Sequence, residues 1–116
     1  MRHANKGRKF GRKRDQRKAF LKSLAVNLIM KGRIKTTEAR AKEMRRLVER
    51  LITKTKNADL AGIRYCEKFL PKTTVAKLLK EVAPKYKERS GGYCRIIKLG
   101  SRASDGAPLV YIELIE

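Results

Sequence analysis

The chain has few of the residues from which enzyme and zinc sites are usually built. It contains one histidine, His3, two cysteines, Cys66 and Cys94, and no tryptophan. A single histidine excludes any site with two histidine ligands, and neither cysteine has a close C-x-x-C partner, so structural zinc is not expected. We predict that both cysteines pack as small apolar residues, with no metal ligands and no cofactor.

Catalytic and nucleotide-binding motifs are missing as well. The sequence has no GxxxxGK[ST] loop, no GxGxxG after a predicted strand and no HExxH. Its carboxylates lie among many more cations, where pairing across one helical turn is the plain interpretation, as for Glu38 and Lys42. We therefore predict no catalytic residue, no small-molecule substrate and no enzymatic activity.

Long apolar runs are also missing. None approaches the ~20 residues needed to cross a bilayer, and the basic N-terminus is not followed by the apolar segment of a secretory signal peptide. Two cysteines are too few for a disulfide framework. These features predict an intracellular, cytoplasmic protein without membrane contact.

Acidic residues are scarce, with 11 Asp and Glu against 31 Lys and Arg, which gives a net charge of +20. Such a chain repels itself unless a polyanion neutralises it, so nucleic acid is the first partner to consider. The first 40 residues hold 14 of the basic and 2 of the acidic side chains. The N-terminal third therefore carries most of the electrostatic attraction.

Residues 1–14 form a basic segment with seven Lys and Arg, no acid and glycines at Gly7 and Gly11. The segment has almost nothing to bury, so we expect it to be disordered alone. We predict an RNA-binding arm that orders along phosphates, in which His3 makes a polar contact to a phosphate or base. A solubilising tail is the alternative.

Residues 15–116 are predicted to form one α+β domain, in the order helix, strand, three helices, two strands. Asp15 is expected to cap a first helix that runs to about Met30 and ends at Gly32, a residue suited to a left-handed cap. The segment 33–37 is then predicted to be a short strand.

The segment from Ile34 to Lys56 organises the rest of the chain. Thr36 and Thr37 can offer hydroxyls to the first turn of a helix, and Glu38 follows where the helix dipole favours an anion. Apolar residues then recur every three or four positions and form one face: Ala41, Met44, Leu47, Val48, Leu51, Ile52 and Thr55. The opposite face is cationic.

Two shorter helices are predicted next. Asp59 is expected to cap the third helix, which Pro71 closes, and Thr73 to cap the fourth, which Pro84 stops.

Two strands follow, over 93–99 and 109–115, joined by a wide hairpin. In the second strand Val110, Ile112 and Leu114 are expected to face inward, whereas the inward face of the first stays open. With so few strands, the economical architecture is a two-layer α/β domain, a small mixed sheet packed against helices.

The pattern favours RNA over DNA only by elimination. There is no basic-region heptad, no zinc-finger spacing and no evident helix-turn-helix with a recognition helix, nor an aromatic pair of the RRM type. A compact basic domain with an arm suits folded RNA gripped by shape and phosphate. A dimeric DNA-binding architectural protein and an RNA chaperone or subunit of an RNA-modifying enzyme remain as alternatives.

Several stretches together resemble one known family. They are MRH at the start, GRKFGR in the arm, I-x-T-T-x-x-x-A-K-E-x-R from Ile34, LITKTK from Leu51, GGYxRI from Gly91 and APLVYIEL from Ala107. In order and spacing they resemble large-subunit ribosomal protein seventeen of bacteria, over essentially the whole chain. The resemblance implies a structural role near the polypeptide exit tunnel, a two-layer α/β fold, and 23S ribosomal RNA and neighbouring large-subunit proteins as partners of a monomer within the ribosome.

The resemblance places the arm, the Thr36–Thr37 helix start, Lys42 and Arg45 against RNA. Asp15 and Gln16 depart from the family, which often carries Ser or His there. Combined with the cationic helix faces and the arginines beside glycine loops, the predicted RNA contacts are Arg2, His3, Lys6, Arg8, Lys9, Arg12, Lys13, Arg14, Arg17, Lys18, Lys35, Thr36, Thr37, Arg40, Lys42, Arg45, Arg46, Arg89, Gly91, Gly92, Arg95 and Arg102.

Overall fold

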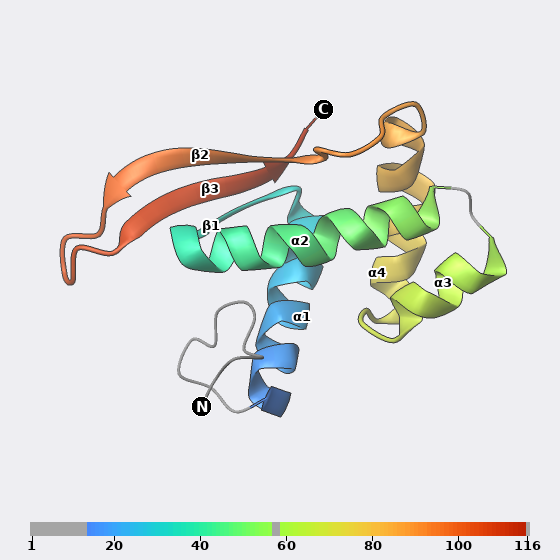
Figure 1. Cartoon of the computed structure of the whole chain (residues 1–116), viewed down its shortest axis with the longest axis horizontal. Coiled ribbons are helices and arrows are strands. Elements are labelled where there is room, and N and C mark those ends of the chain that lie inside the picture. Colours follow the sequence, from blue (N-terminus) through green and yellow to red (C-terminus); the bar gives the residue numbers. More distant parts are fainter. Residues whose placement is uncertain (1–13, 57–58, 116) are drawn as a thin grey trace, which may run out of the picture.

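The computed structural model describes residues 14–56 and 59–115, and the elements follow the predicted order (Figure 1). They are α1 (Arg14–Lys31), β1 (Arg33–Thr37), α2 (Glu38–Thr55), α3 (Leu60–Glu67), α4 (Lys72–Lys77) with its π and 3-10 continuations η1 (Leu78–Val82) and η2 (Ala83–Tyr86), β2 (Cys94–Ser101) and β3 (Pro108–Leu114). The α+β class is confirmed. Residues 1–13 of the predicted arm lie outside the described residues.

The sheet has the strand order β1-β3-β2. Both pairs are antiparallel, with Arg33 opposite Glu113 in one and Arg95 opposite Glu113 in the other. The prediction of a mixed sheet was therefore wrong. β1 and β2 run the same way, but the last strand lies between them, so no parallel pair forms.

The domain has two layers, with the sheet on one side and the helices on the other (Figure 1). α2 lies beneath the sheet and contacts all three strands, while α1 crosses below it and α3 and α4 pack at its C-terminal end. The predicted stripe of α2 is buried, with Met44, Val48 and Leu51 inaccessible to solvent. Val110 and Ile112 meet it from β3, which confirms the predicted inward face.

The open question for β2 is settled by the register. Cys94 is buried and Ile96 packs against the core, so these residues face inward, while Arg95 is exposed on the outer face. Two buried tyrosines, Tyr86 and Tyr93, complete one end of the otherwise aliphatic core, with ring centroids 5.1 Å apart.

Two predicted helix ends are confirmed. Gly32 has φ of +80°, and its amide donates to the carbonyl of Leu28 at 2.7 Å, which closes α1. Asp59 caps α3, because its Oδ1 accepts from the amide of Gly62 at 2.7 Å.

Three other caps were predicted wrongly. The described part of α1 runs from Arg14, and Asp15 lies within the helix and not at its cap. Thr37 holds the cap position of α2, but its hydroxyl makes no capping bond. Pro71 holds the cap position of α4 with an extended backbone and no side-chain capping bond, and Thr73 lies within the helix.

Pro84 does not end the fourth helical segment. The helix first widens into η1 and then tightens into η2, with Pro84 in the first turn of η2. Proline has no amide hydrogen to donate, and the helix changes from the π to the 3-10 form beside this residue. No helix within the described ranges is both long and apolar enough to cross a membrane.

Candidate nucleic-acid interface

The cysteines belong to the core and not to a reactive site. Cys66 is inaccessible to solvent and Cys94 is 3% exposed. Burial raises the pKa of the Cys66 thiol to about 11 and that of Cys94 to about 12, to which the nearby Glu49 carboxylate also contributes. Both thiols therefore stay neutral, as apolar packing residues do. In the described part of the chain, no three His, Cys, Asp or Glu side chains gather as metal ligands.

Seven of the predicted contact residues lie outside the described residues: Arg2, His3, Lys6, Arg8, Lys9, Arg12 and Lys13. Arg14 is described and lies exposed at the start of α1. Arg17 follows on the stripe that also holds Leu21, and its Nε is buried without a hydrogen-bond partner among the described residues.

α1, α2 and the turn after α3 enclose a groove of about 500 Å³, which we call the cationic groove. Its walls bring Lys18 and Arg46, both predicted contacts, to the same surface. The full lining is Lys18, Leu21, Lys22, Glu43, Arg46, Leu47, Arg50, Lys68 and Phe69. Five cations thus face one carboxylate around an apolar floor, and such an excess attracts a polyanion.

Other cations of α2 are already paired. Lys42 lies 2.9 Å from Glu38, which confirms the predicted pairing, and Arg45 lies 3.7 Å from Glu49, each across one turn. Exposed pairs of this kind contribute little, about 0.3–0.5 kcal/mol each. A phosphate can therefore exchange with the carboxylate at small cost.

The cationic surface predicted opposite the core stripe is narrower than expected. The guanidinium of Arg40 lies over the ring of Phe20 on α1, 4.9 Å from the ring centre. Arg40 therefore faces the neighbouring helix. Lys42, Arg45 and Arg46 remain together and line a hollow of about 350 Å³ with Glu49.

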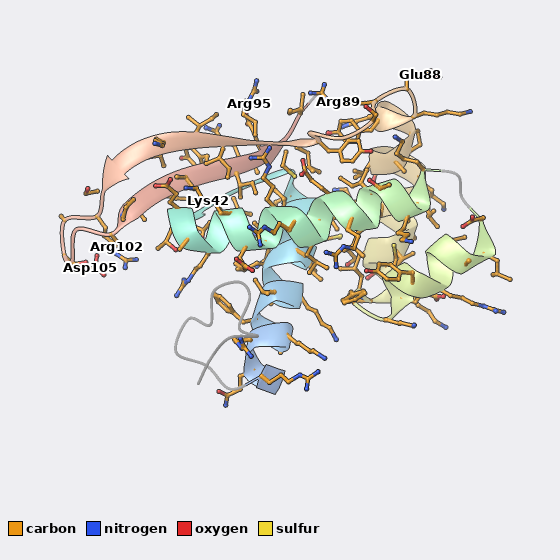
Figure 2. The ribbon with its side chains drawn as sticks, in the orientation of Figure 1. Lys42, Glu88, Arg89, Arg95, Arg102 and Asp105 are labelled. Carbon is orange, nitrogen blue, oxygen red and sulfur yellow. The ribbon has the colours of Figure 1, made fainter. Side chains whose placement is uncertain are left out.

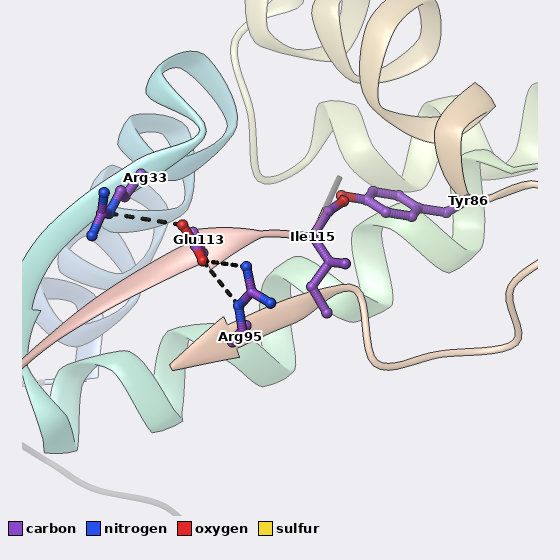
Figure 3. A network of polar contacts seen from close by, with 5 residues as sticks. All are labelled: Arg33, Tyr86, Arg95, Glu113 and Ile115. Carbon is purple, nitrogen blue, oxygen red and sulfur yellow. Dashed lines mark hydrogen bonds and ion pairs between the residues drawn. The ribbon is translucent and has the colours of Figure 1, made fainter. Parts of the chain in front are cut away.

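The outer face of the sheet carries a second basic cluster (Figure 3). Glu113 lies between two arginines: Nη2 of Arg95 is 2.7 Å from its carboxylate, and Nε of Arg33 is 3.8 Å from it. The guanidinium of Arg33 also stacks on Tyr111, 3.7 Å from the ring centre. Lys35 is exposed on the same face and pairs in register with Tyr111. This cluster combines several cations with one carboxylate and a ring.

The loop before β2 presents Arg89 next to two glycines. Gly91 and Gly92 have φ of +144° and +63°, and Nε of Arg89 donates to the carbonyl of Gly91 at 3.0 Å. Lys56 at the end of α2 ties the loop down by donating to the carbonyl of Arg89 and to the hydroxyl of Tyr93. The loop is therefore held in a fixed shape with its arginine exposed.

Arg102 lies apart from the loop that holds Arg89. It lies at the tip of the β2–β3 hairpin, whereas Arg89 and Arg95 lie toward the other end of the molecule (Figure 2). Asp105 accepts from its Nε and Nη2 at 2.9 and 2.6 Å. This bond lowers the pKa of Asp105 to about 2, aided by the amide of Ala107. The long, antiparallel hairpin separates residues that are close in sequence.

Thr36 offers little surface to any ligand. It lies on the inner face of β1 and is 9% exposed. Thr37 is half-buried at the start of α2. We therefore leave Thr36 out of the interface.

Lys22, Lys68 and Phe69 were not predicted as site residues, and the structure adds them to the groove. The spacing of Lys18 and Lys22, one helical turn apart, was a usable signal. Lys68 and Phe69 carried none, because only the packing of α3 brings them beside α1.

Comparison with known proteins gives one consistent result. The family model described as "Ribosomal protein L17" matches residues 20–115. A protein of a Thermoanaerobacter species, named "Large ribosomal subunit protein bL17", is 53% identical over 109 residues, which cover 93% of this chain and 97% of that protein. Proteins of the same name from Pelobacter propionicus and Staphylococcus haemolyticus are 46% and 50% identical, covering 100% and 94% of this chain and 92% and 98% of their own lengths.

Proposed function

Because the chain belongs to the ribosomal protein L17 family, it is a structural, non-enzymatic constituent of the large ribosomal subunit, and we propose that it binds 23S ribosomal RNA there. The finer proposal is that residues 1–14 act as an RNA-binding arm and residues 15–116 as one rigid domain that presents cationic surfaces. In this proposal the chain is a monomer within the ribosome and also contacts neighbouring large-subunit proteins. Its position in the subunit is near the polypeptide exit tunnel.

The observation that supports this proposal most is the cationic groove, where five Lys and Arg side chains from three segments converge with only one carboxylate. A fold has no stability reason to gather like charges, since their repulsion weakens the folded state. Phosphates offset that repulsion and release counterions on binding. The groove therefore supports RNA contact on the α1–α2 side of the domain.

Two further surfaces extend the proposed interface. The outer sheet face adds Lys35 and Arg95, and the loop before β2 adds Arg89, which precedes two glycines. Arginine can grip a phosphate with two parallel hydrogen bonds. Since these arginines already hold carboxylates or carbonyls of the protein, their geometry is fixed before RNA arrives.

The test is filter binding of the full chain to 23S ribosomal RNA at several salt concentrations. Changing Arg8, Lys9 and Arg12 to Gln should weaken binding and lower the magnitude of the salt slope by about 2 to 3, since each lost phosphate contact removes about 0.7–0.9. The matched control changes three exposed cations elsewhere, Lys72, Lys80 and Lys87, to Gln and should keep the slope.

If the two triple variants have equal effects, the arm makes no specific contact and RNA binding depends on the net charge of the chain alone. If the unmodified chain does not bind 23S ribosomal RNA, the proposed function itself is contradicted.

A further inference from the structure

We propose that the cationic groove receives an unpaired RNA base, which lies on its apolar floor while the adjoining phosphates contact its cationic rim. This inference rests on the proposed function and adds to it a site for one nucleotide. Figure 1 shows the three segments involved: the N-terminal half of α1, the middle of α2 and the turn that follows α3.

The floor of the groove is apolar and contains a ring. Leu21 of α1 and Leu47 of α2 line it together with Phe69, and all three are partly buried against the core. Phosphate groups gain nothing from such a surface. A base does, because every base has a π-face that stacks on an aromatic ring, with a contribution of about 1–3 kcal/mol.

The ring is held firmly. Phe69 packs on Tyr65 with ring centres 5.2 Å apart and planes at 50°, and its amide donates to the carbonyl of Cys66 at 3.0 Å. A ring fixed before binding loses little conformational entropy when a base stacks on it. Phe69 therefore belongs to the groove wall before any ligand binds, with the Lys22 ammonium over its ring.

The rim supplies the charge for the backbone on either side of the base. Arg46 and Arg50 stand on α2, one turn apart, and Lys18 faces them from α1. Lys22 lies over the Phe69 ring, 5.8 Å from its centre. Its long side chain can move from the ring to a phosphate when a base takes its place. Proteins that bind single-stranded nucleic acid combine Arg and Lys side chains for the phosphates with an aromatic ring for the base.

The size of the groove agrees with one nucleotide. Its volume of about 500 Å³ lies within the range of roughly 300–1,000 Å³ that small-ligand sites have. A regular RNA helix keeps its bases stacked inside, so it could touch the rim but would leave the floor empty. The groove therefore selects a bulged or looped-out base and not a continuous duplex.

The test uses the full chain and two synthetic RNA hairpins that differ only in one bulged 2-aminopurine, a fluorescent base that dims on stacking. Binding is followed by anisotropy, and stacking by the intensity of the base. The unmodified chain should bind the bulged hairpin about tenfold more tightly than the paired one, the size that one stacked base supports, and the base should dim.

Phe69→Leu keeps an apolar side chain on the floor but removes the ring. It should reduce the preference for the bulge to less than about twofold and leave binding of the paired hairpin unchanged. Arg46→Gln with Arg50→Gln should weaken both hairpins and lower the salt slope by about 1.5. The control Lys72→Gln with Lys80→Gln removes the same charge from exposed positions of the fourth helical segment. Thermal unfolding of each variant shows that it folds.

The proposal is wrong if the unmodified chain binds both hairpins alike, or if Phe69→Leu keeps the preference. It is also wrong if a polyglutamate peptide, and not the bulged RNA, loses affinity on Phe69→Leu, since an acidic protein segment would then be the occupant. Intact binding of 23S ribosomal RNA in those cases would leave the proposed function standing. Loss of that binding would defeat both.

Discussion

Replacing Gly62 by alanine should destabilise the domain, although helix propensity alone predicts the opposite. Gly62 is a buried residue of α3, where alanine is ordinarily preferred to glycine by about 1 kcal/mol. A Cβ at this position, however, would overlap the carbonyl oxygen of Lys54 in α2 and lie 2.8 Å from Oδ1 of Asp59. α3 can therefore approach α2 this closely only because residue 62 has no side chain.

The expected loss follows from these contacts. The overlap is with backbone, which cannot rotate away, so the cost lies near the upper end of the roughly 1–3 kcal/mol of overpacked cores. The Cβ would also displace the Asp59 carboxylate that caps α3. Loss of this cap costs about 1 kcal/mol, which offsets the gain in helix propensity. We expect a net loss of about 3 kcal/mol, or roughly 12 °C in the melting temperature of a domain of this size.

The assay is urea and thermal unfolding followed by circular dichroism, with Ala61→Gly as the matched control. Ala61 is exposed on the same helix, so the control should lose only about 1 kcal/mol through propensity. A Gly62→Ala variant as stable as the unmodified chain, or more stable, would refute the reasoning about close helix approach.

Three further predictions concern the rest of the domain. Gly32→Ala should cost about 1 kcal/mol in urea unfolding, because φ of +80° strains alanine although the space beside it is open. Cys66 and Cys94 should resist alkylation at pH 8 until urea unfolds the chain. Because their pKa values are raised in the folded state, the neutral thiols favour that state below pH 9. This contribution to stability is lost as the pH rises through about 11 to 12. The carboxyl of Asp105, with its pKa lowered from 3.8 to about 2, should titrate by NMR near pH 2 and favour the fold above pH 3.8; Arg102→Gln should move the midpoint upward.

Much of the fold was predictable because local patterns and tertiary packing agree. The apolar stripe of α2, the glycine after α1 and the Asp59 cap each follow from spacing or backbone chemistry within a few residues. The strand pairing was not predictable in the same way. Whether β1 lies beside β2 or β3 depends on contacts across some 75 residues of chain, and no local signal reports them.

The candidate site was predictable in its charge and not in its shape. The sequence pattern predicted a cationic face on α2, and Arg46 of that face lies in the groove. The sequence could not show that Arg40 turns onto Phe20, nor that Phe69 would meet Lys22. An apolar residue at helical spacing is usually buried in the core, so the sequence gives Phe69 no signal of a binding role. Only the packing of three segments places this ring in the wall of a groove.

The central claim is that the chain is a ribosomal RNA-binding constituent of the large subunit, and sedimentation of a cell lysate through a sucrose gradient tests it most directly. We expect the protein to migrate with the large subunit and to stay there through a moderate-salt wash, because several phosphate contacts must break together for release. Its recovery at the top of the gradient, or with chromosomal DNA, would contradict the account.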